Sequence, residues 1–321
     1  MKQGDRYSAS AITVYLTSKI EKLFYSDLKD KGSIMTQEIK ALFQRELPEI
    51  LIGEHSVEDV LSDAENHFIY RMEKGKLTGV SVINKNTVYL LLVDSQFQGH
   101  GIGTSLLKES EIFIRANGYN KIRLGAGDGY IMPGVPMNKN VHLFFEKHGY
   151  IHSWGEEGCF DLSMPLCDFT CSTNKPGDII DGNLYRFAQK EDIEGIIRCC
   201  SDDAGGFAVH YKNDGMYKPG ALNPVFVAES DGEILAAIMA GVESEKKSVG
   251  YLGCLVTSPD HRNKGLGTNL VKLGTGYLKD SGLKTSWLSY TYTSIIGIYE
   301  RIGYKVCMEY FMGEKELQSY F

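Results

Sequence analysis

The sequence predicts an α/β (α+β) protein made of two similar units, each a mixed β-sheet with helices on both faces. Three observations support this fold class. The length of 321 residues suits about two domains of ordinary size. Segments with strand-like and helix-like patterns follow one another in a similar order in both halves. A glycine-rich turn between an apolar strand and an amphipathic helix occurs twice, 164 residues apart.

The two glycine-rich turns are followed by matching elements. Each opens an amphipathic helix, which we expect at residues 104–117 in the first half and 268–281 in the second. Gly118 and Gly282 end these helices at the same distance from the turn, because glycine easily adopts the left-handed conformation found at helix C-termini. The shared spacing indicates an internal duplication. The duplicated motifs are Gln98-x-x-Gly101-x-Gly103 and Arg262-x-x-Gly265-x-Gly267.

The other segments give each unit the order β-α-α-β-β-β-α-β-α-β. We place a linker at residues 171–182, between an N-terminal domain at 1–170 and a C-terminal domain at 183–321. The first unit has about ten extra residues, rich in Gly and Pro, at 127–136. Strands are expected at 11–16, 68–73, 77–84, 121–124, 184–188, 225–230, 233–241 and 285–288, and further helices at 18–31, 37–46, 143–150, 191–200 and 297–304.

Charge and composition exclude several classes of protein. The net charge is −7 and the pI about 5.7, so the chain lacks the basic surface of a general nucleic-acid binder. The first ten residues are polar, and the longest apolar stretch, residues 234–242, is far too short to span a bilayer. The seven cysteines lack the spacing of a zinc site. We therefore expect a cytoplasmic protein with reduced thiols, no metal, and no nucleic-acid or membrane partner; the oligomeric state stays open.

A strand that runs into Gly-x-Gly at a helix start presents a cluster of backbone N–H groups. With the helix dipole, these donors favour a bound pyrophosphate, and glycine lets the phosphate oxygens approach closely. The turns lack the Lys-Ser/Thr ending of a P-loop and occur too late in each unit for a dinucleotide fingerprint. A single turn of this kind could be a glycine-rich turn without a ligand, but two copies in the same context make that interpretation much weaker.

The turns and the segment Ile298-Tyr299-Glu300-Arg301-Ile302-Gly303-Tyr304 resemble the two signatures of the GNAT superfamily of N-acetyltransferases. The resemblance covers both halves and implies two GNAT-like domains, each with a splayed sheet. It implies that the turns hold the pyrophosphate of acetyl-CoA and that a splayed strand pairs with the pantetheine arm. The residues it assigns to the cofactor are Leu92, Val93, Gln98, Gly99, His100, Gly101, Ile102, Gly103, Thr104 and Asn138 in the first copy, and Leu255, Val256, Thr257, Arg262, Asn263, Lys264, Gly265, Leu266, Gly267 and Thr268 in the second.

The resemblance also implies the chemistry, in which an amine attacks the acetyl thioester and an acid protonates the departing CoA thiolate. In many family members this acid is a tyrosine that Tyr299 matches, whereas the first copy has Phe145 at that position. A phenol can donate a proton and a phenyl ring cannot, so we expect the second copy to be the catalytic one. The alternative is that Tyr299 is a packed aromatic side chain on the inner face of its helix.

No residue identifies itself as the general base. We select Glu243, which follows the third strand of the second copy, near where a base often lies in the family. Glu243 and its neighbour Glu245 could instead be solvated turn charges beside two lysines. Glu229 is a weaker candidate, and a water chain to a distant carboxylate would also serve. His210, Tyr211 and Asp214 lie in a Gly/Asn-rich loop before the second strand, where substrate-binding segments usually occur.

These features predict an acyltransferase that moves an acetyl group from acetyl-CoA to a primary amine of a small molecule or peptide. The aromatic residues Trp287, Tyr290 and Tyr292 could line a substrate channel, and the insertion at 130–136 could cover the first site. Two different functions stay open. One is an acyl-CoA sensor, or a degenerate tandem protein without turnover, and the second is transfer of a different acyl group.

Overall fold

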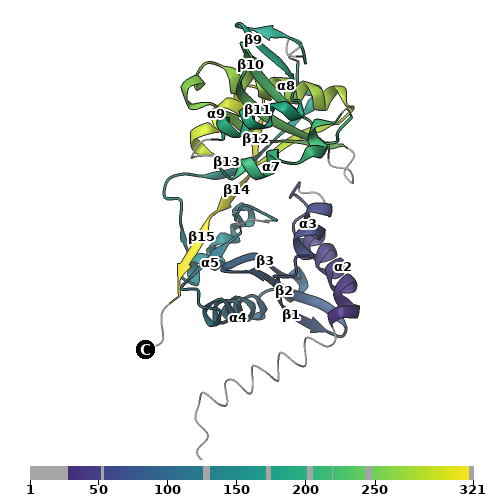
Figure 1. Ribbon diagram of the computed structural model, residues 1–321. Helices are drawn as coiled ribbons and strands as arrows, with labels where there is room; N and C mark the ends of the chain where they lie inside the picture. Colours follow the sequence, from purple (N-terminus) through teal and green to yellow (C-terminus); the bar gives the residue numbers. More distant parts are fainter. Residues whose placement is uncertain are drawn as a thin grey trace, which may run out of the picture.

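The computed structural model describes residues 28–51, 54–125, 131–170, 175–200, 205–218, 220–242 and 248–317. These residues form two mixed β-sheets with helices packed on both faces, one sheet in each half of the molecule (Figure 1). The predicted α/β (α+β) class is confirmed. The strand expected at residues 11–16 and most of the helix expected at 18–31 lie outside the described residues.

The N-terminal half is built on a six-stranded sheet in the order β1-β2-β3-β4-β15-β6. The helices α2 and α3 pack on one face of this sheet, and α4 and α5 pack on the other. Its own elements are α2 (Leu28–Glu46), α3 (Glu54–Leu61), β1 (His67–Glu73), β2 (Lys76–Asn84), β3 (Thr87–Val93), α4 (Ile102–Ala116), β4 (Lys121–Leu124), α5 (His142–Lys147) and β6 (Ile151–His152).

The helix α2 corrects one expectation. The sequence predicted two helices, at residues 18–31 and 37–46, but α2 runs from Leu28 to Glu46 without a break. Its side chains Ile39, Leu42 and Phe43 are buried in the core shared with β2 and β3. Glycine and serine within α2 have low helix propensity and destabilise it, but the packing of its apolar side chains stabilises the helix by more.

The C-terminal half is built on a nine-stranded sheet in the order β5-β14-β7-β13-β12-β11-β10-β9-β8. The helices α6 and α7 cover one face, and α8 and α9 cover the other. Asp231 and Gly232 join β10 to β11 with φ of 48° and 81°, which is the tight hairpin turn that the sequence predicted. The elements are β8 (Ile179–Ile180), β9 (Asn183–Phe187), α6 (Ile193–Cys199), α7 (Phe207–Tyr211), β10 (Val225–Ser230), β11 (Glu233–Val242), β12 (Val249–Thr257), α8 (Leu266–Asp280), β13 (Thr285–Tyr292), α9 (Thr293–Glu300) and β14 (Lys305–Phe311).

The two halves exchange strands. The strand β7 (Cys159–Pro165) comes from the N-terminal half but lies between β13 and β14 of the C-terminal sheet. The strand β15 (Gly313–Glu316) comes from the end of the chain but lies between β4 and β6 of the N-terminal sheet. In Figure 1, β14 and β15 form one yellow path from the upper half to the lower half. The boundaries 1–170 and 183–321 therefore divide the chain by sequence, but each sheet also contains strand residues from the other half.

Three smaller segments also differ from expectation. Part of the linker expected at 171–182 is β8, an edge strand that pairs with β9. Part of the insertion is β5 (Val135–Pro136), which pairs with β14. The helices α5 and α9 end earlier than predicted, because the chain turns at Gly149 and Gly303, where φ is 85° and 116°.

Candidate active site

The C-terminal sheet opens between its two central parallel strands. The strands β12 and β13 pair only from Val249 and Thr285 to Tyr251 and Trp287. Beyond these residues β12 pairs with β11, and β13 pairs with β7, so the two strands diverge. We call this gap the C-terminal cleft. It is the splayed arrangement that the sequence resemblance implied.

Both strands carry a bulge just beyond the point where they diverge. Cys254 in β12 and Tyr290 in β13 have positive φ, 53° and 59°, and the pairing register shifts at both places. A non-glycine residue in this conformation costs free energy, and such strain is common at functional sites. The hydroxyl of Tyr211, on α7, donates a hydrogen bond to the Cys254 carbonyl and so holds the first bulge in place. The sequence had offered Tyr211 only as a possible substrate contact.

The turn between β12 and α8 surrounds a hollow of about 400 Å³. Asn263 and Gly265 in this turn have φ of 61° and 83°, a conformation that brings backbone N–H groups together in a concave nest. The first amides of α8 add further N–H groups that have no acceptor within the helix. Eight of the residues predicted to bind the cofactor line this hollow: Leu255, Thr257, Arg262, Asn263, Gly265, Leu266, Gly267 and Thr268.

The other two predicted residues do not line the hollow. Val256 is buried in the core beneath α6 and α7, and Lys264 is exposed. The hollow also contains Arg301, from the end of α9, which the sequence analysis did not select. Arg301 and Arg262 therefore supply two guanidinium groups beside a cluster of backbone amides. Such a site suits a pyrophosphate, because guanidinium groups form strong charge-assisted hydrogen bonds to phosphate oxygens.

Tyr299 lies on the inner face of α9 and is 7% exposed. Burial raises the pKa of its hydroxyl well above the usual range, and the neighbouring Tyr304, Tyr292 and Cys254 raise it further. Because Cys254 affects the pKa of this phenol, we infer that the phenol lies near the bulge of the C-terminal cleft. A raised pKa keeps the phenol protonated, which is the state that a proton donor needs. Tyr299 can therefore be packed on the inner face of α9 and still lie near the cleft as a proton donor.

A buried carboxylate that the sequence analysis did not select also lies beside the cleft. Asp161, on the exchanged strand β7, is 2% exposed. It accepts hydrogen bonds from the hydroxyl groups of Ser289 at 2.5 Å and Tyr310 at 2.7 Å, and from the backbone N–H of Tyr290. Burial raises the pKa of Asp161 to about 6, although these hydrogen bonds oppose the shift. The sequence held no signal for this site, because it exists only through the strand exchange.

The N-terminal copy repeats the backbone of the glycine-rich turn. Gly99 and Gly101 have φ of 77° and 81°, close to the values in the second copy. The charges differ, however, because Gln98 stands where the second copy has an arginine. The Gln98 amide donates to the Val93 carbonyl at 3.0 Å. The first copy therefore preserves the shape of a pyrophosphate-binding turn with less positive charge.

The strands β3 and β4 also diverge, and we call the gap between them the N-terminal cleft. Its free volume is only about 80 Å³, because insertion residues Met132 and 134–136 line it together with Phe145. The packing is so close that a Cβ on Gly125 would lie 2.7 Å from the backbone of Gly134. The described residues of the insertion thus line the space between the strands, while the sequence had offered the insertion as a cover over the first site.

Two family models match the chain, and both describe acetyltransferases. A model described as "Acetyltransferase (GNAT) domain" matches residues 34–163, and one described as "Acetyltransferase (GNAT) family" matches residues 191–304. Together the two segments cover more than half of the chain. The chain belongs to the GNAT acetyltransferase family. It is a tandem member, since each half matches separately.

Solved structures show the same fold over most of the chain. A tandem GNAT protein from the clavulanic acid biosynthesis pathway has a TM-score of 0.68 and 13% identity, with 91% of this chain and 97% of that chain covered. A GCN5-related N-acetyltransferase from Sphaerobacter thermophilus has a TM-score of 0.61 and 16% identity, with 91% and 94% covered. At these identities the likeness shows the fold alone.

A third structure is part of a larger protein. It contains a GCN5-related glucosamine N-acetyltransferase region in a fungal multi-domain GH3 beta-N-acetylglucosaminidase, with a TM-score of 0.68 and 16% identity. The alignment covers 90% of the present chain, which spans only 37% of that protein. A search of curated protein sequences finds no match to this chain.

Of the base candidates selected from the sequence of this GNAT protein, only some lie among the described residues. Glu243 lies outside the described residues, so its role stays a prediction. Glu229 forms an ion pair with Arg186 at 2.6 Å, and Asp214 forms one with Lys190 at 2.8 Å. Both of these carboxylates therefore have a cationic partner, unlike the buried Asp161.

Asn138, which the GNAT resemblance assigned to the cofactor, lies in a short 3-10 helix before α5. Its side-chain amide donates to the Glu49 carboxylate at 2.5 Å. Leu92 lines the narrow N-terminal cleft, while residues 98–104 form the first turn and the start of α4. The cofactor contacts of the first GNAT copy therefore stay predictions, and the filled cleft makes them less favourable than those of the second.

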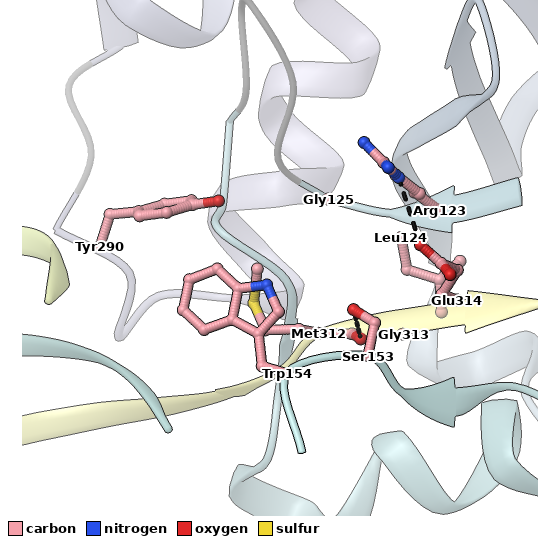
Figure 2. Close-up of a pocket in the computed structure, with 9 residues that line it drawn as sticks. All are labelled: Arg123, Leu124, Gly125, Ser153, Trp154, Tyr290, Met312, Gly313 and Glu314. Carbon is pink, nitrogen blue, oxygen red and sulfur yellow. Dashed lines mark hydrogen bonds and ion pairs between the residues drawn. The ribbon is translucent and has the colours of Figure 1, made fainter. Parts of the chain in front are cut away.

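A further hollow of about 300 Å³ lies where the two GNAT halves meet (Figure 2). Tyr290, from the end of β13, and Trp154 form one side, with their ring centroids 5.5 Å apart. Arg123 and Glu314 form an ion pair at 3.3 Å on the other side. Of the three aromatic residues expected to line a channel, Tyr290 thus faces a hollow that both halves build.

Three further findings concern possible partners. Within the described ranges, no helix is long and apolar enough to cross a membrane. In the same part of the chain, no group of three or more His, Cys, Asp or Glu side chains could hold a metal ion. The six cysteines that the structure describes are free.

Proposed function

We propose that this protein transfers the acetyl group of acetyl-CoA to a primary amine of a small molecule or peptide, and that it does so at the C-terminal cleft. One observation carries the proposal. The turn with two arginines beside a hollow of about 400 Å³, and the buried Tyr299, both occur in the second copy. In the first copy, Gln98 and Phe145 stand in place of Arg262 and Tyr299, and the space beside the diverging strands is only about 80 Å³. We assign turnover to residues 183–321, completed by β7.

The geometry supports a direct transfer. The amides of residues 263–268 and the two arginines would bind the pyrophosphate. Beyond Tyr251, no described strand pairs with β12 on its β13 side, so its backbone groups can pair with an extended pantetheine arm. The bulge at Cys254 would direct a backbone N–H toward the carbonyl oxygen of the thioester, where negative charge develops. Tyr299, kept protonated by burial, would then donate a proton to the CoA thiolate.

Composition and the described residues support the proposed acceptor class and compartment. A net charge of −7 favours cationic acceptors such as protonated amines. Free cysteines and the absence of a membrane-spanning helix among the described residues support the cytoplasm as the compartment.

The release of CoA from acetyl-CoA tests this proposal when it is measured with a panel of primary amines. We expect Tyr299→Phe to lower kcat by about 10²-fold, because general acid catalysis contributes about this much, and to leave the KM for acetyl-CoA nearly unchanged. The matched control is Phe145→Leu at the corresponding position of the first copy, which should leave kcat unchanged.

One result would favour an acyl-CoA sensor instead. If acetyl-CoA raises the melting temperature of the wild-type protein while no amine gives turnover, the protein binds the cofactor without acetyl transfer.

A further inference from the structure

We propose that Asp161, which the exchanged strand β7 brings to the C-terminal sheet, takes up the proton that the acceptor amine must lose, and that the hydroxyl of Ser289 relays it. This inference rests on the proposed acetyl transfer at the C-terminal cleft. It assigns the proton acceptor of the second copy to a residue of the first half of the chain. Asp161 would act as a positioning residue, through Ser289, since it is itself 2% exposed.

The position of Ser289 connects the carboxylate to the cleft. Ser289 follows Trp287, the last residue of β13 that pairs with β12, by two positions, so it lies where the strands have begun to diverge. It is half-buried, and its hydroxyl donates to Asp161 Oδ1 at 2.5 Å. The other carboxylate oxygen, Oδ2, accepts from the Tyr310 hydroxyl at 2.7 Å. A proton from the cleft can therefore reach Asp161 through one hydroxyl group.

The groups around the carboxylate leave it able to accept a proton. The titratable neighbours of Asp161 are Cys159 on its own strand, Cys307 and Tyr310 on β14, and Tyr290 on β13. The buried indole N–H of Trp287 faces it without hydrogen-bonding geometry. None of these groups carries a positive charge, and Asp161 has no ion pair in the part of the chain that the structure describes. A pKa of about 6 then lets Asp161 change protonation state close to neutral pH.

The N-terminal sheet provides an internal comparison. The pair Trp287–Ser163 between β13 and β7 corresponds to the pair Arg123–Glu314 between β4 and β15. Two positions further along, Ser289 and Asp161 correspond to Gly125 and Met312, which line the hollow in Figure 2. An exchanged strand can therefore be held in a sheet without a buried acid at this place. The serine and the aspartate occur only in the copy that has Tyr299 and the turn with two arginines.

The ammonium group of the acceptor gives one proton to the Ser289 oxygen, while the Ser289 proton passes to the Asp161 carboxylate. The free amine then attacks the thioester carbon, and the C–S bond breaks as the oxyanion collapses. The CoA thiolate receives a proton from Tyr299, and the second proton on nitrogen passes through solvent to the Tyr299 phenolate, which restores the phenol. Asp161 returns its proton to solvent by the reverse relay, so one proton is released in each turnover.

The test is the pH dependence of kcat/KM for an amine that the wild-type enzyme acetylates. We expect kcat/KM of the wild type to rise with pH through about 6, since the carboxylate must be ionised to accept a proton. Asp161→Asn should remove this rise and lower kcat/KM by about 10²-fold at neutral pH. Tyr310→Phe removes a hydrogen bond that stabilises the ionised form, so it should move the rise to higher pH.

Ser289→Ala should lower kcat/KM while the Kd for acetyl-CoA stays unchanged. Its matched control is Ser286→Ala on the same strand, whose hydroxyl bonds to Tyr304 at 2.7 Å on the opposite face of the sheet and whose loss should leave the pH profile as it is. If Asp161→Asn and Ser289→Ala keep the rise at the same pH, Asp161 is only structural and the inference is wrong. Absence of turnover in the wild type would instead contradict the proposed function on which the inference rests.

Discussion

The two clefts share one backbone plan and differ in what occupies them. Both are gaps between parallel strands, and both adjoin a turn with two left-handed residues. In the first copy, the insertion and Phe145 leave about 80 Å³ between the strands, while in the second copy a hollow of about 400 Å³ with two arginines lies at the turn itself. The motif thus preserves the backbone of the turn in both copies, while the side chains around it differ. An intact glycine-rich turn is therefore weak evidence for a working site.

The exchange of strands makes this difference possible within one chain. Each half takes its last strand from the other, so a residue of the first half, Asp161, reaches the second cleft. The first cleft receives Met312 at the corresponding place, from the end of the chain. The two clefts therefore cannot be understood from their own halves alone.

We expect the largest effect, on folding and solubility, when the two halves are produced as separate fragments. Residues 1–174 expressed alone lack β15, and residues 175–321 lack β7, so each fragment leaves two neighbouring strands of its sheet unpaired. We expect each fragment to aggregate when it is produced alone, and the two together to form a soluble complex. Size-exclusion chromatography with light scattering checks this. A monomeric fragment that unfolds cooperatively would show that the exchanged strands are dispensable.

The next largest effect, on acetyl-CoA binding, comes from replacing the same glycine in each of the two turns. Gly265 and Gly101 have φ of 83° and 81°, and a Cβ would meet no other atom within 4 Å at either position, so replacement strains both similarly. We expect Gly265→Glu to weaken acetyl-CoA binding more than about 10²-fold, because a carboxylate would repel the pyrophosphate. Gly101→Glu should leave acetyl transfer within about twofold of the wild type. Calorimetry and CoA release measure the two quantities, and equal losses in both variants would remove the asymmetry that we infer.

The smallest effect concerns the buried acid in the exchanged strand. The pKa of Asp161 is raised in the folded protein, so its stabilising contribution is complete at low pH and is lost as pH rises through about 6. Between pH 5 and pH 8 this loss should amount to about 1 to 2 kcal/mol of the unfolding free energy. Urea unfolding at several pH values should show it in the wild type and not in Asp161→Asn. The same slope in both proteins would show that the pKa of Asp161 is not raised.

Much of the fold could be predicted because it depends on local patterns. The hairpin at Asp231-Gly232 and the helix after each turn depend on glycine chemistry and periodicity within about twenty residues. The strand β10 occurs at the residues that the sequence predicted. The turns lie where their spacing placed them, and eight of the ten cofactor residues predicted for the second copy line one hollow.

The other features of the fold and the site depend on contacts between residues that are far apart in the sequence. An apolar strand at residues 159–165 pairs equally well with any suitable sheet, so its sequence does not state which half will accept it. For this reason Glu243 and Glu229 could be selected from the sequence, whereas Asp161, which lies 128 residues from its partner Ser289, could not. Arg301 was missed for a simpler reason, since only the fold places the end of α9 beside the turn.

The position of β15 has a consequence for how the protein is made. Lys121 and Glu314 are hydrogen-bonded although 193 residues separate them. While the ribosome is still adding the second copy, the first copy has an open edge at β4, and its final strand does not yet exist. A typical domain can fold soon after it emerges, but this one must wait until β15 has been synthesised. The nascent N-terminal half should therefore depend on chaperones that shield sheet edges, and a premature stop near residue 310 should be as harmful to it as an early one.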